Sequence, residues 1–201
     1  SDLRERFARA FLSGRLPGSV IIAGAEDLGT MELALECARL LLCREPSVNG
    51  ACGQCPSCRQ FAAGTHLDFM VALCSKSTEA REGADLTNSP ARALERVSDE
   101  PDKTVRVGTL RSLCQACAES PASGPVRVAM VTYAERMQAS AANTILKTFE
   151  EPPAHARLIL VSAGLRRLLP TLVSRAFKLE VRGVAHAEAL AYLGAEAATA
   201  P

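Results

Sequence analysis

Four of the eight cysteines fall in one short segment and could together bind a metal ion: Cys43, Cys52, Cys55 and Cys58. The last three are separated by two residues each, and thiolates at such spacings close tetrahedral Zn²⁺ sites. Gly50 and Gly53 provide the turns that would bring the sulfur atoms to one point. Because four protein ligands leave no position for an activated water, we expect a structural zinc site rather than a catalytic one.

Two alternatives to zinc remain open for this cluster: free or transiently oxidised thiols, and an iron–sulfur cluster with similar ligands. Elsewhere, Cys114 and Cys117 lie on the apolar side of a helical pattern, which favours core packing over redox chemistry. We expect His66 and His155 at the surface or capping a helix, because the cysteine site has no position left for another ligand.

A second candidate site follows an apolar run that ends at Ala23. Gly24 and Gly29 have the spacing of the phosphate-binding loop G-x-x-x-x-G-K-[ST], in the strand–loop–helix context that this motif needs. Thr30 stands in the position of the lysine, and Met31 in that of the Mg²⁺-binding hydroxyl. Neither side chain replaces the lost charge or the hard oxygen ligand. The loop therefore indicates a nucleotide-binding scaffold without a working site, although two glycines at this spacing also occur by chance.

Apolar runs alternate with helical patterns along most of the chain. This alternation is typical of an α/β fold in which helices cover both faces of a parallel sheet. It predicts five strands, at residues 20–23, 68–73, 126–132, 157–162 and 177–181. It predicts helices at residues 2–13, 30–42, 57–63, 107–119 and 139–150, with helical turns near 91–96 and within 165–173.

The same patterns predict the domain organisation. We expect one nucleotide-binding-type domain over residues 1–182, with the zinc module at 43–58 placed between a helix and the second strand. Residues 74–103 are rich in Ser, Glu, Asp, Ala and Pro and carry little periodicity, which predicts a flexible surface insertion. A new helical pattern predicts the start of a helical lid domain over residues 183–201, truncated in this chain.

The composition of the chain argues against several classes of function. A net charge of +1 over 201 residues argues against a protein that wraps nucleic acid through bulk charge. The absence of Trp and an aromatic content of 4% argue against base stacking. No apolar run reaches the ~20 residues that span a bilayer, and no secretory signal opens the chain, so we expect no membrane partner and a cytoplasmic location.

Three further segments resemble the subunits of bacterial clamp loaders, which belong to the AAA+ family. Residues 142–153 read ANTILKTFEEPP, which is similar to the family's ANALLKTLEEPP helix. Residues 168–175 read LLPTLVSR, similar to LLPTIxSRC, and residues 64–68 read GTHLD, similar to GxHPD. With the four-cysteine insert, the resemblance covers roughly residues 7–181. It implies an AAA+ P-loop-type fold with a parallel five-stranded sheet, a zinc-binding insert and the start of a helical lid.

Within this family the pattern resembles the delta-prime branch of DNA polymerase III more than the ATP-hydrolysing gamma/tau branch. An active ATPase of this type ends its third strand with adjacent Asp and Glu, which hold Mg²⁺ and orient water. Here the strand runs into Thr132 and Tyr133, and the next acid, Glu135, is offset. The resemblance therefore implies a subunit that does not hydrolyse ATP, and we expect no bound ATP.

The resemblance also implies a role and partners. A delta-prime subunit is a rigid stator of the DNA polymerase III holoenzyme in the bacterial cytoplasm, where gamma/tau and delta subunits load the sliding clamp onto primer-template DNA with it. Arg175, preceded by Ser174, would be an arginine finger acting in trans on ATP held by a neighbouring subunit. The chain departs from the family at Ala176, where cysteine is usual, and this leaves the charge in place. Because ligands of open α/β sheets gather at the carboxyl ends of strands, we expect Arg175 near that edge.

Two other functions remain open from the sequence. A gamma/tau-like clamp-loader ATPase with an unusual phosphate loop would bind nucleotide in a Mg²⁺-dependent manner. A zinc-dependent DNA-binding module would show salt-sensitive affinity for DNA, which the near-neutral charge disfavours.

Overall fold

The computed structural model describes residues 2–76, 85–94 and 103–183. The five helices and five strands expected from periodicity are confirmed, with ends that differ by no more than one residue. The helical turns expected near 91–96 and within 165–173 correspond to short helices at Pro90–Ala93, Leu165–Arg167 and Pro170–Arg175. The helices are α1 (Asp2–Leu12), α2 (Thr30–Leu42), α3 (Pro56–Ala62), α4 (Pro90–Ala93), α5 (Val107–Ala118), α6 (Ala139–Glu150) and α7 (Pro170–Arg175). The strands are β1 (Ser19–Ala23), β2 (Phe69–Ala72), β3 (Leu86–Thr87), β4 (Arg127–Val131), β5 (Ala156–Ser162) and β6 (Phe177–Glu180). Short 3₁₀ turns are η1 (Glu26–Leu28), η2 (Ala134–Arg136) and η3 (Leu165–Arg167).

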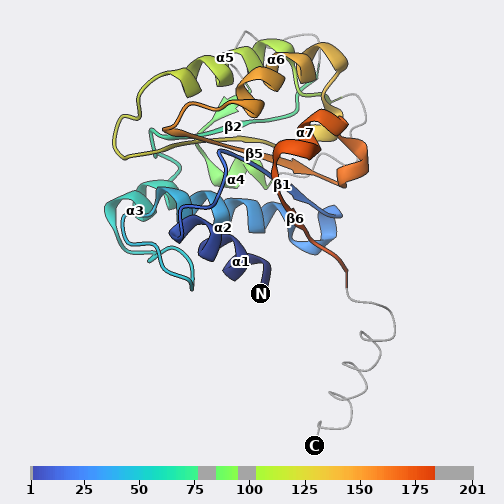
Figure 1. Ribbon diagram of the computed structural model, residues 1–201. Coiled ribbons are helices and arrows are strands. Elements are labelled where there is room, and N and C mark those ends of the chain that lie inside the picture. The colour runs from blue at the N-terminus through green and yellow to red at the C-terminus, as the bar shows by residue number, and fades with distance from the viewer. Residues whose placement is uncertain (1, 77–84, 95–102, 184–201) are drawn as a thin grey trace, which may run out of the picture.

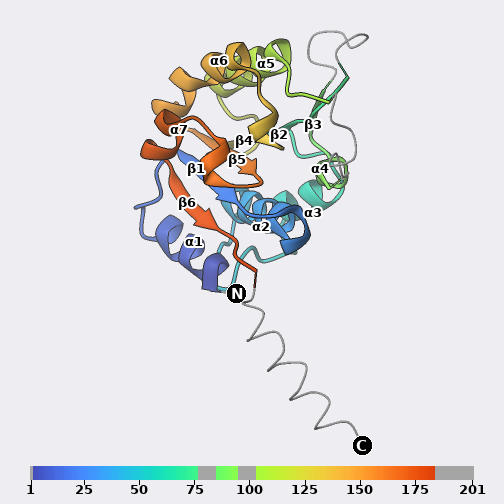
Figure 2. The same cartoon turned by 90° about the vertical axis from the view of Figure 1, so that its right-hand side faces the viewer.

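The strands form one sheet in the order β3-β2-β4-β5-β1-β6. Figure 1 shows three layers, with α5, α6 and α7 on one face of the sheet and α1 and α2 on the other. Figure 2 turns the molecule so that β6 and β3 are seen toward opposite ends of the sheet. The expected α/β architecture with helices on both faces is therefore confirmed.

Five of the strands pair in parallel, as the sequence predicted. The sixth, β3, pairs antiparallel with β2 through Val71 and Thr87 and through Ala72 and Leu86. It lies inside the region expected to be a flexible insertion, and its two residues are too few to show a periodicity. The insertion thus contributes one edge strand and the short helix α4 to the described part of the chain. The flexibility expected for residues 74–103 stays a prediction, because 77–84 and 95–102 lie outside the described residues. The lid domain expected over 183–201 also stays a prediction, because 184–201 lie outside them.

The central strands are mostly apolar because both of their faces are covered. In β1, Val20 and Ile22 contact the apolar cluster beneath α1 and α2, while Ile21 and Ala23 contact the cluster beneath α5, α6 and α7. All five residues of β1 and all five of β4 are buried. Strands buried on both faces read as continuous apolar runs rather than alternating patterns.

The parallel arrangement gives the sheet two chemically different edges. The loops after β1, β4 and β5 all leave from the carboxyl ends of these strands and meet at one edge. The segments that precede β2, β4, β5 and β6 lie at the opposite, amino edge. The phosphate-type loop belongs to the carboxyl edge, and Arg175, which ends α7 just before β6, belongs to the amino edge.

A buried ion pair organises the amino edge. Asp68, which directly precedes β2, is fully buried, and its Oδ1 lies 3.3 Å from Nη2 of Arg127 at the start of β4. The Asp68 carboxylate also accepts hydrogen bonds from the backbone N–H groups of Ala122 (2.6 Å) and Ser123 (2.7 Å) and from the Ser123 hydroxyl (2.7 Å). Burial opposes ionisation of Asp68, but these donors outweigh it and hold the pKa of the carboxyl below its ordinary value.

Arg127 carries the same network to α5. Its Nη1 donates to the carbonyl oxygen of Ala116 (2.6 Å), and its Nη2 donates to that of Ser120 (3.2 Å). The guanidinium thus joins the end of α5, the following loop and two strands.

Among the described residues, none of the helices combines the length and hydrophobicity needed to cross a membrane.

We expect Asp68→Asn to lower the free energy of unfolding by about 3–5 kcal/mol, because it leaves Arg127 as a buried charge without its partner. Urea denaturation followed by circular dichroism measures this. Glu119→Gln is the matched control, because Glu119 also pairs with Arg127 (3.5 Å) but its side chain is 66% exposed. The control should change stability by less than about 0.5 kcal/mol, and an equal effect of both variants would contradict the prediction.

The same pair predicts a dependence on pH. Since the pKa of Asp68 is lower in the folded state than in the unfolded chain, ionised Asp68 stabilises the fold above the unfolded pKa of about 3.9. This contribution is lost as the pH falls through the folded pKa. The stability difference between the wild type and Asp68→Asn should therefore shrink as acid is added.

Candidate functional site

Helix ends and two glycine turns position the four cysteines. Cys43 is the residue that ends α2, and Cys55 is the N-cap of α3, which Pro56 begins. Between them the chain turns at Gly50 and Gly53, whose φ angles of 119° and 78° lie in the region that glycine adopts most readily. The glycine turns that the sequence predicted are therefore present.

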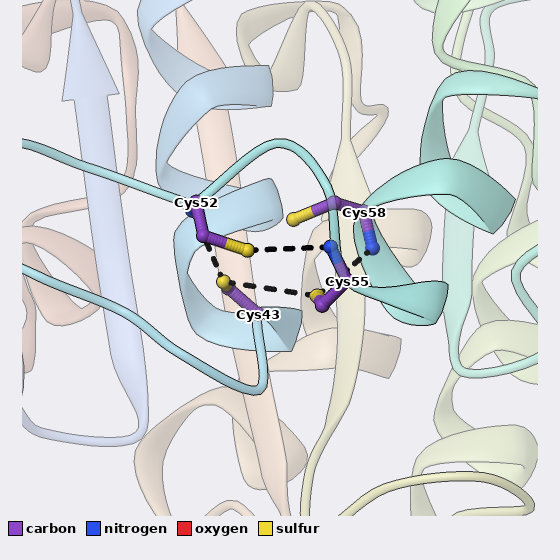
Figure 3. A group of neighbouring side chains, drawn as sticks. All are labelled: Cys43, Cys52, Cys55 and Cys58. Atoms are coloured by element: carbon purple, nitrogen blue, oxygen red, sulfur yellow. Dashed lines mark hydrogen bonds between the residues drawn. The ribbon is translucent and has the colours of Figure 1, made fainter.

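The structure brings the sulfur atoms of all four cysteines together. Their Sγ atoms lie within 4.8 Å of one another, and those of Cys43 and Cys55 are 4.0 Å apart. Figure 3 shows Cys43, Cys52, Cys55 and Cys58 gathered between the end of α2 and the start of α3. Four thiolates bound to one Zn²⁺ are about 3.8 Å apart, given a Zn–S distance of about 2.3 Å. The cluster can therefore hold a metal ion such as zinc after a contraction of about 1 Å at most.

Backbone N–H groups point at these sulfur atoms. The N–H groups of Glu45 and Cys52 donate to Sγ of Cys43 at 3.4 and 3.3 Å. The N–H of Cys55 donates to Sγ of Cys52 at 3.4 Å, and the N–H of Cys58 donates to Sγ of Cys55 at 3.5 Å. Such donors stabilise thiolates, the form in which cysteine binds metals.

The thiols of the cluster differ in acidity, because burial raises the pKa of Cys43 to about 12 and also raises that of Cys58. Burial acts to raise the pKa of Cys55, but backbone N–H donors and the neighbouring thiols outweigh it and lower the pKa to about 6. In contrast, burial raises the pKa of Cys74 and of Cys117 to about 12. Cys117 packs in the apolar cluster beneath α5 and α6, with Cys114 at its margin, as their helical spacing predicted.

His66 connects the cysteine module to the sheet, and the expectation of a surface position for it is wrong. Its side chain is buried, with Nε2 2.8 Å from Oγ of Ser57 in α3 and Nδ1 accepting from the N–H of Asp68 at 3.1 Å. Because the Ser57 hydroxyl donates to the carbonyl oxygen of Leu42 (2.6 Å), Nε2 must carry the proton and donate to Ser57. His66 is therefore neutral in this network, and burial is the main cause that lowers its pKa.

The phosphate-type loop runs from β1 to α2 as expected, and Thr30 and Met31, which follow it, make contacts within the protein. The hydroxyl of Thr30, a buried residue, donates back to the carbonyl oxygen of Ala25 at 3.0 Å. A Cβ atom at Gly24 would lie 2.7 Å from the Thr30 hydroxyl oxygen, so Gly24 is required by this close approach. Met31 is almost completely buried. The positions that a phosphate loop uses for charge and for Mg²⁺ therefore serve packing and local hydrogen bonding in this chain.

Tyr133 reaches across the mouth of this loop. It follows β4, and its hydroxyl lies 2.7 Å from Oε1 of Glu26 in the loop. Its φ of 48° makes it the only non-glycine residue in the described ranges with a positive φ, a conformation that costs about 1 kcal/mol or more. Its neighbour Thr132 is buried and donates to the carbonyl oxygen of Ala72 (3.1 Å). Neither residue supplies a carboxylate to the loop.

A cavity of about 680 Å³ lies beside this loop, and it carries charges of both signs. Its charged lining residues are Glu26, Glu135, Arg136 and Arg167. Glu135 accepts a hydrogen bond from the N–H of Ala163 at 3.2 Å, so it ties η2 to the end of β5. The placement of Glu135 in η2, beyond the end of the strand, matches the offset seen in the sequence.

Arg175 does not lie at the edge expected for it. It is the last residue of α7 and precedes β6, which places it at the amino edge and not at the carboxyl edge. Its side chain is 56% exposed, with Nε 3.8 Å from Oε1 of Glu150 at the end of α6. Ser174 is exposed, and its hydroxyl donates to the carbonyl oxygen of Thr171 (3.0 Å). The error came from treating a segment before a strand as if it followed one.

Three side chains of structural importance escaped the sequence reasoning. Asp68 and Arg127 stand at strand ends and look like ordinary surface charges in the sequence. Tyr133 was noted only as a missing carboxylate. The signal that could have found Asp68 is its place directly before an apolar strand, where a charged side chain must be buried with a partner.

Comparisons with known proteins agree with the fold. The family model for the DNA polymerase III delta subunit matches residues 1–185. A DNA polymerase III subunit delta' from Pseudomonas aeruginosa is 34% identical over 155 residues, which is 77% of this chain and 40% of that protein. The corresponding subunit delta' from Escherichia coli is 29% identical over 171 residues, covering 85% of this chain and 44% of that protein.

More distant matches include tau and gamma subunits of DNA polymerase III. A DNA polymerase III subunit tau from Salmonella typhimurium is 22% identical over 171 residues, 85% of this chain and 22% of that protein. A solved structure of a gamma subunit-related protein from Thermotoga maritima shares the fold, with a TM-score of 0.55 and 23% identity over 94% of this chain and 48% of that one. The chain spans less than half the length of the curated relatives it matches.

We expect about one Zn²⁺ per chain in freshly purified protein, measured by elemental analysis, because the four sulfur atoms fit a tetrahedral site. Cys58→Ala should lower the metal content and speed amide hydrogen exchange in residues 43–58, while the strands keep their protection. Cys114→Ala, outside the cluster, is the control and should keep the metal. Four titratable thiols in the cluster without any metal would contradict the assignment, and visible iron absorption would favour an iron–sulfur cluster.

Proposed function

This chain belongs to the family of the DNA polymerase III delta subunit, and from that premise we propose that it is the nucleotide-binding-type domain of a delta-prime subunit of a bacterial clamp loader. It does not hydrolyse ATP. It acts as a stator that holds its neighbours while the complex loads the sliding clamp onto primed DNA. Its four-cysteine module binds one structural Zn²⁺.

The observation that carries this proposal is the state of the phosphate-type loop. Thr30 donates its hydroxyl to the carbonyl oxygen of Ala25 and Met31 is almost completely buried, so neither supplies the charge or the Mg²⁺ ligand of a phosphate loop, although both border the cavity beside it. Tyr133 bonds to Glu26 where an ATPase of this family needs carboxylates. These changes lie after two different strands, β1 and β4. A subunit that no longer needs to hydrolyse ATP would be expected to accumulate such changes.

Arg175 is proposed as the residue that serves a neighbour. Its position at the amino edge supports action in trans, because its own phosphate-type loop lies at the opposite edge of the sheet. A guanidinium is permanently charged and suits phosphate oxygens. The long contact with Glu150, at 3.8 Å, leaves Arg175 accessible from solvent.

The proposed partners are the gamma/tau and delta subunits, and through the complex the sliding clamp and primer-template DNA. The proposed location is the bacterial cytoplasm, which the bacterial sources of the delta' relatives support. The matches to tau and gamma subunits keep a gamma/tau-like ATPase as the second candidate. Titration with a fluorescent ATP analogue separates the two, because micromolar, Mg²⁺-dependent binding would favour the ATPase.

We expect the chain to show no Mg²⁺-dependent ATP hydrolysis above that of a buffer blank. Thr30→Lys combined with Met31→Thr should not create it, because Thr132 and Tyr133 still provide no carboxylate. A phosphate-release assay with repurified protein measures this. Turnover that persists through repurification and disappears in a Gly29→Val variant would refute the expectation.

We expect Arg175→Ala to reduce the DNA- and clamp-stimulated ATPase of a complex reconstituted with gamma/tau and delta subunits by about tenfold or more, since an arginine finger supplies 10³–10⁵ in well-studied NTPases. Arg175→Lys should recover only part of the rate, because an ammonium lacks the paired, planar N–H donors with which a guanidinium binds phosphate oxygens. Thermal stability and assembly should not change.

Arg166→Ala is the matched control for the Arg175 experiment. Arg166 is also exposed but lies in η3, which follows β5 at the carboxyl edge. Its loss should leave the stimulated ATPase unchanged. A complex with Arg175→Ala that loads clamps at the wild-type rate would show that the finger is another residue.

A further inference from the structure

A second cavity, of about 560 Å³, lies beside the cysteine module. Its walls come from the end of α2 with Cys43, from α3 and His66, and from the segments 123–126 and 154–157 that lead into β4 and β5. It therefore lies at the amino edge of the sheet. Phe11, Leu41 and Leu42 place it on the face covered by α1 and α2. The pocket beside the phosphate-type loop is at the other edge.

The floor of this cavity is apolar, and its charge has one sign. Apolar lining is provided by Phe11, Leu41, Leu42, Pro46, Pro125 and Val126. The charged lining residues are Arg44 and Arg157, and no carboxylate is among the lining residues. His66 adds no charge, because it is neutral and both of its ring nitrogens are already hydrogen-bonded.

Neither arginine has a carboxylate partner among the residues that the structure describes. Arg157 donates through Nη1 to the carbonyl oxygens of Ala154 (2.9 Å) and Ala156 (2.8 Å), and its Nε is buried with no hydrogen-bond partner in the described part of the chain. Burial lowers the pKa of Arg157, which shows that its charge is partly desolvated. Arg44 is exposed, and no ion pair involves it among the described residues.

We propose that this cavity is a docking site for a segment of a partner protein in which an apolar side chain stands next to an aspartate or glutamate. The apolar floor would bury the side chain, and the two guanidiniums would receive the carboxylate, which they suit better than lysine does. A volume of this size suits a compact group of side chains. Nucleic acid fits less well, because Phe11 is the one Phe, Tyr or Trp among the lining residues and two arginines form no track for a phosphate backbone.

This site is separate from the one proposed for Arg175. Helix α7 packs on the face of the sheet covered by α5 and α6, whereas the cavity lies on the face of α1 and α2. A variant that loses peptide docking should therefore keep the stimulated ATPase measured in the Arg175 experiment. If either the docking proposal or the Arg175 proposal fails, the other is still tested independently.

Gly124 offers a way to block the cavity without disturbing the fold. It lines the cavity, a Cβ atom there would meet nothing within 4 Å, and its φ is outside the range that only glycine tolerates. Gly124→Trp should therefore place an indole in the mouth. Gly164 has the same open surroundings but lies at the carboxyl edge, so Gly164→Trp is its matched control.

A charge reversal tests the second part of the proposal. Arg44→Glu changes the sign of an exposed lining residue. Arg111→Glu is its control, because Arg111 is exposed on α5, on the other face of the sheet. Circular dichroism and metal content should be unchanged in all four variants.

The experiment measures fluorescence anisotropy with a panel of labelled octapeptides that place Leu, Ile, Phe or Tyr beside Asp or Glu. We expect saturable binding of at least one peptide, weaker by about tenfold when its acids become amides or when Arg44→Glu is used. Gly124→Trp should abolish binding, and the two controls should bind like the wild type. No saturable binding by any peptide, or binding that survives Gly124→Trp, would overturn the proposal. A labelled oligothymidine that binds in place of the peptides and is lost with Gly124→Trp would also overturn it, in favour of a nucleic-acid site.

Discussion

The fully buried carboxylate of Asp68 links the start of β2 to the start of β4 and to the loop that follows α5. It pairs with Arg127 and accepts hydrogen bonds from the loop at Ala122 and Ser123. Through the backbone N–H of Asp68, His66 joins the same network and continues it to Ser57 in the cysteine module. A buried charge is tolerated only when it is fully paired, so the amino edge of the sheet, the end of α5 and the cysteine module must keep one arrangement relative to one another.

This rigid amino edge contrasts with the carboxyl edge. At the carboxyl edge the usual ligand site of an open α/β sheet is present in shape, but Tyr133 and Thr30 use their hydroxyls on protein partners. The amino edge carries the groups that are still accessible, which are Arg175 on one face of the sheet and the cavity lined by Arg44 on the other. A protein whose task is to hold and serve its neighbours needs its active groups on its outer surfaces, and this distribution fits such a task.

Much of this fold could be predicted from the sequence because the signals are local. The ends of helices and strands follow from periodicity, glycine and proline, and they are correct to one residue. The four-cysteine site could be predicted because its spacing and its glycine turns lie within a short segment. The strand β3 could not be predicted, since two residues are too few to show an alternation of apolar and polar side chains. The sequence around it also lacks hydrophobic periodicity and resembles a loop.

The sequence by itself determined the elements, the fold class, the four-cysteine cluster and the changes in the phosphate-type loop, because each depends on residues that are close together in the chain. Only the tertiary structure decided that His66 is buried, that Arg175 lies at the amino edge, and that Tyr133 reaches Glu26 across more than a hundred residues of chain. Such features depend on which strand ends meet and which side chains lose their water. A sequence pattern states neither, because burial and pairing are properties of the packed sheet and not of any one segment.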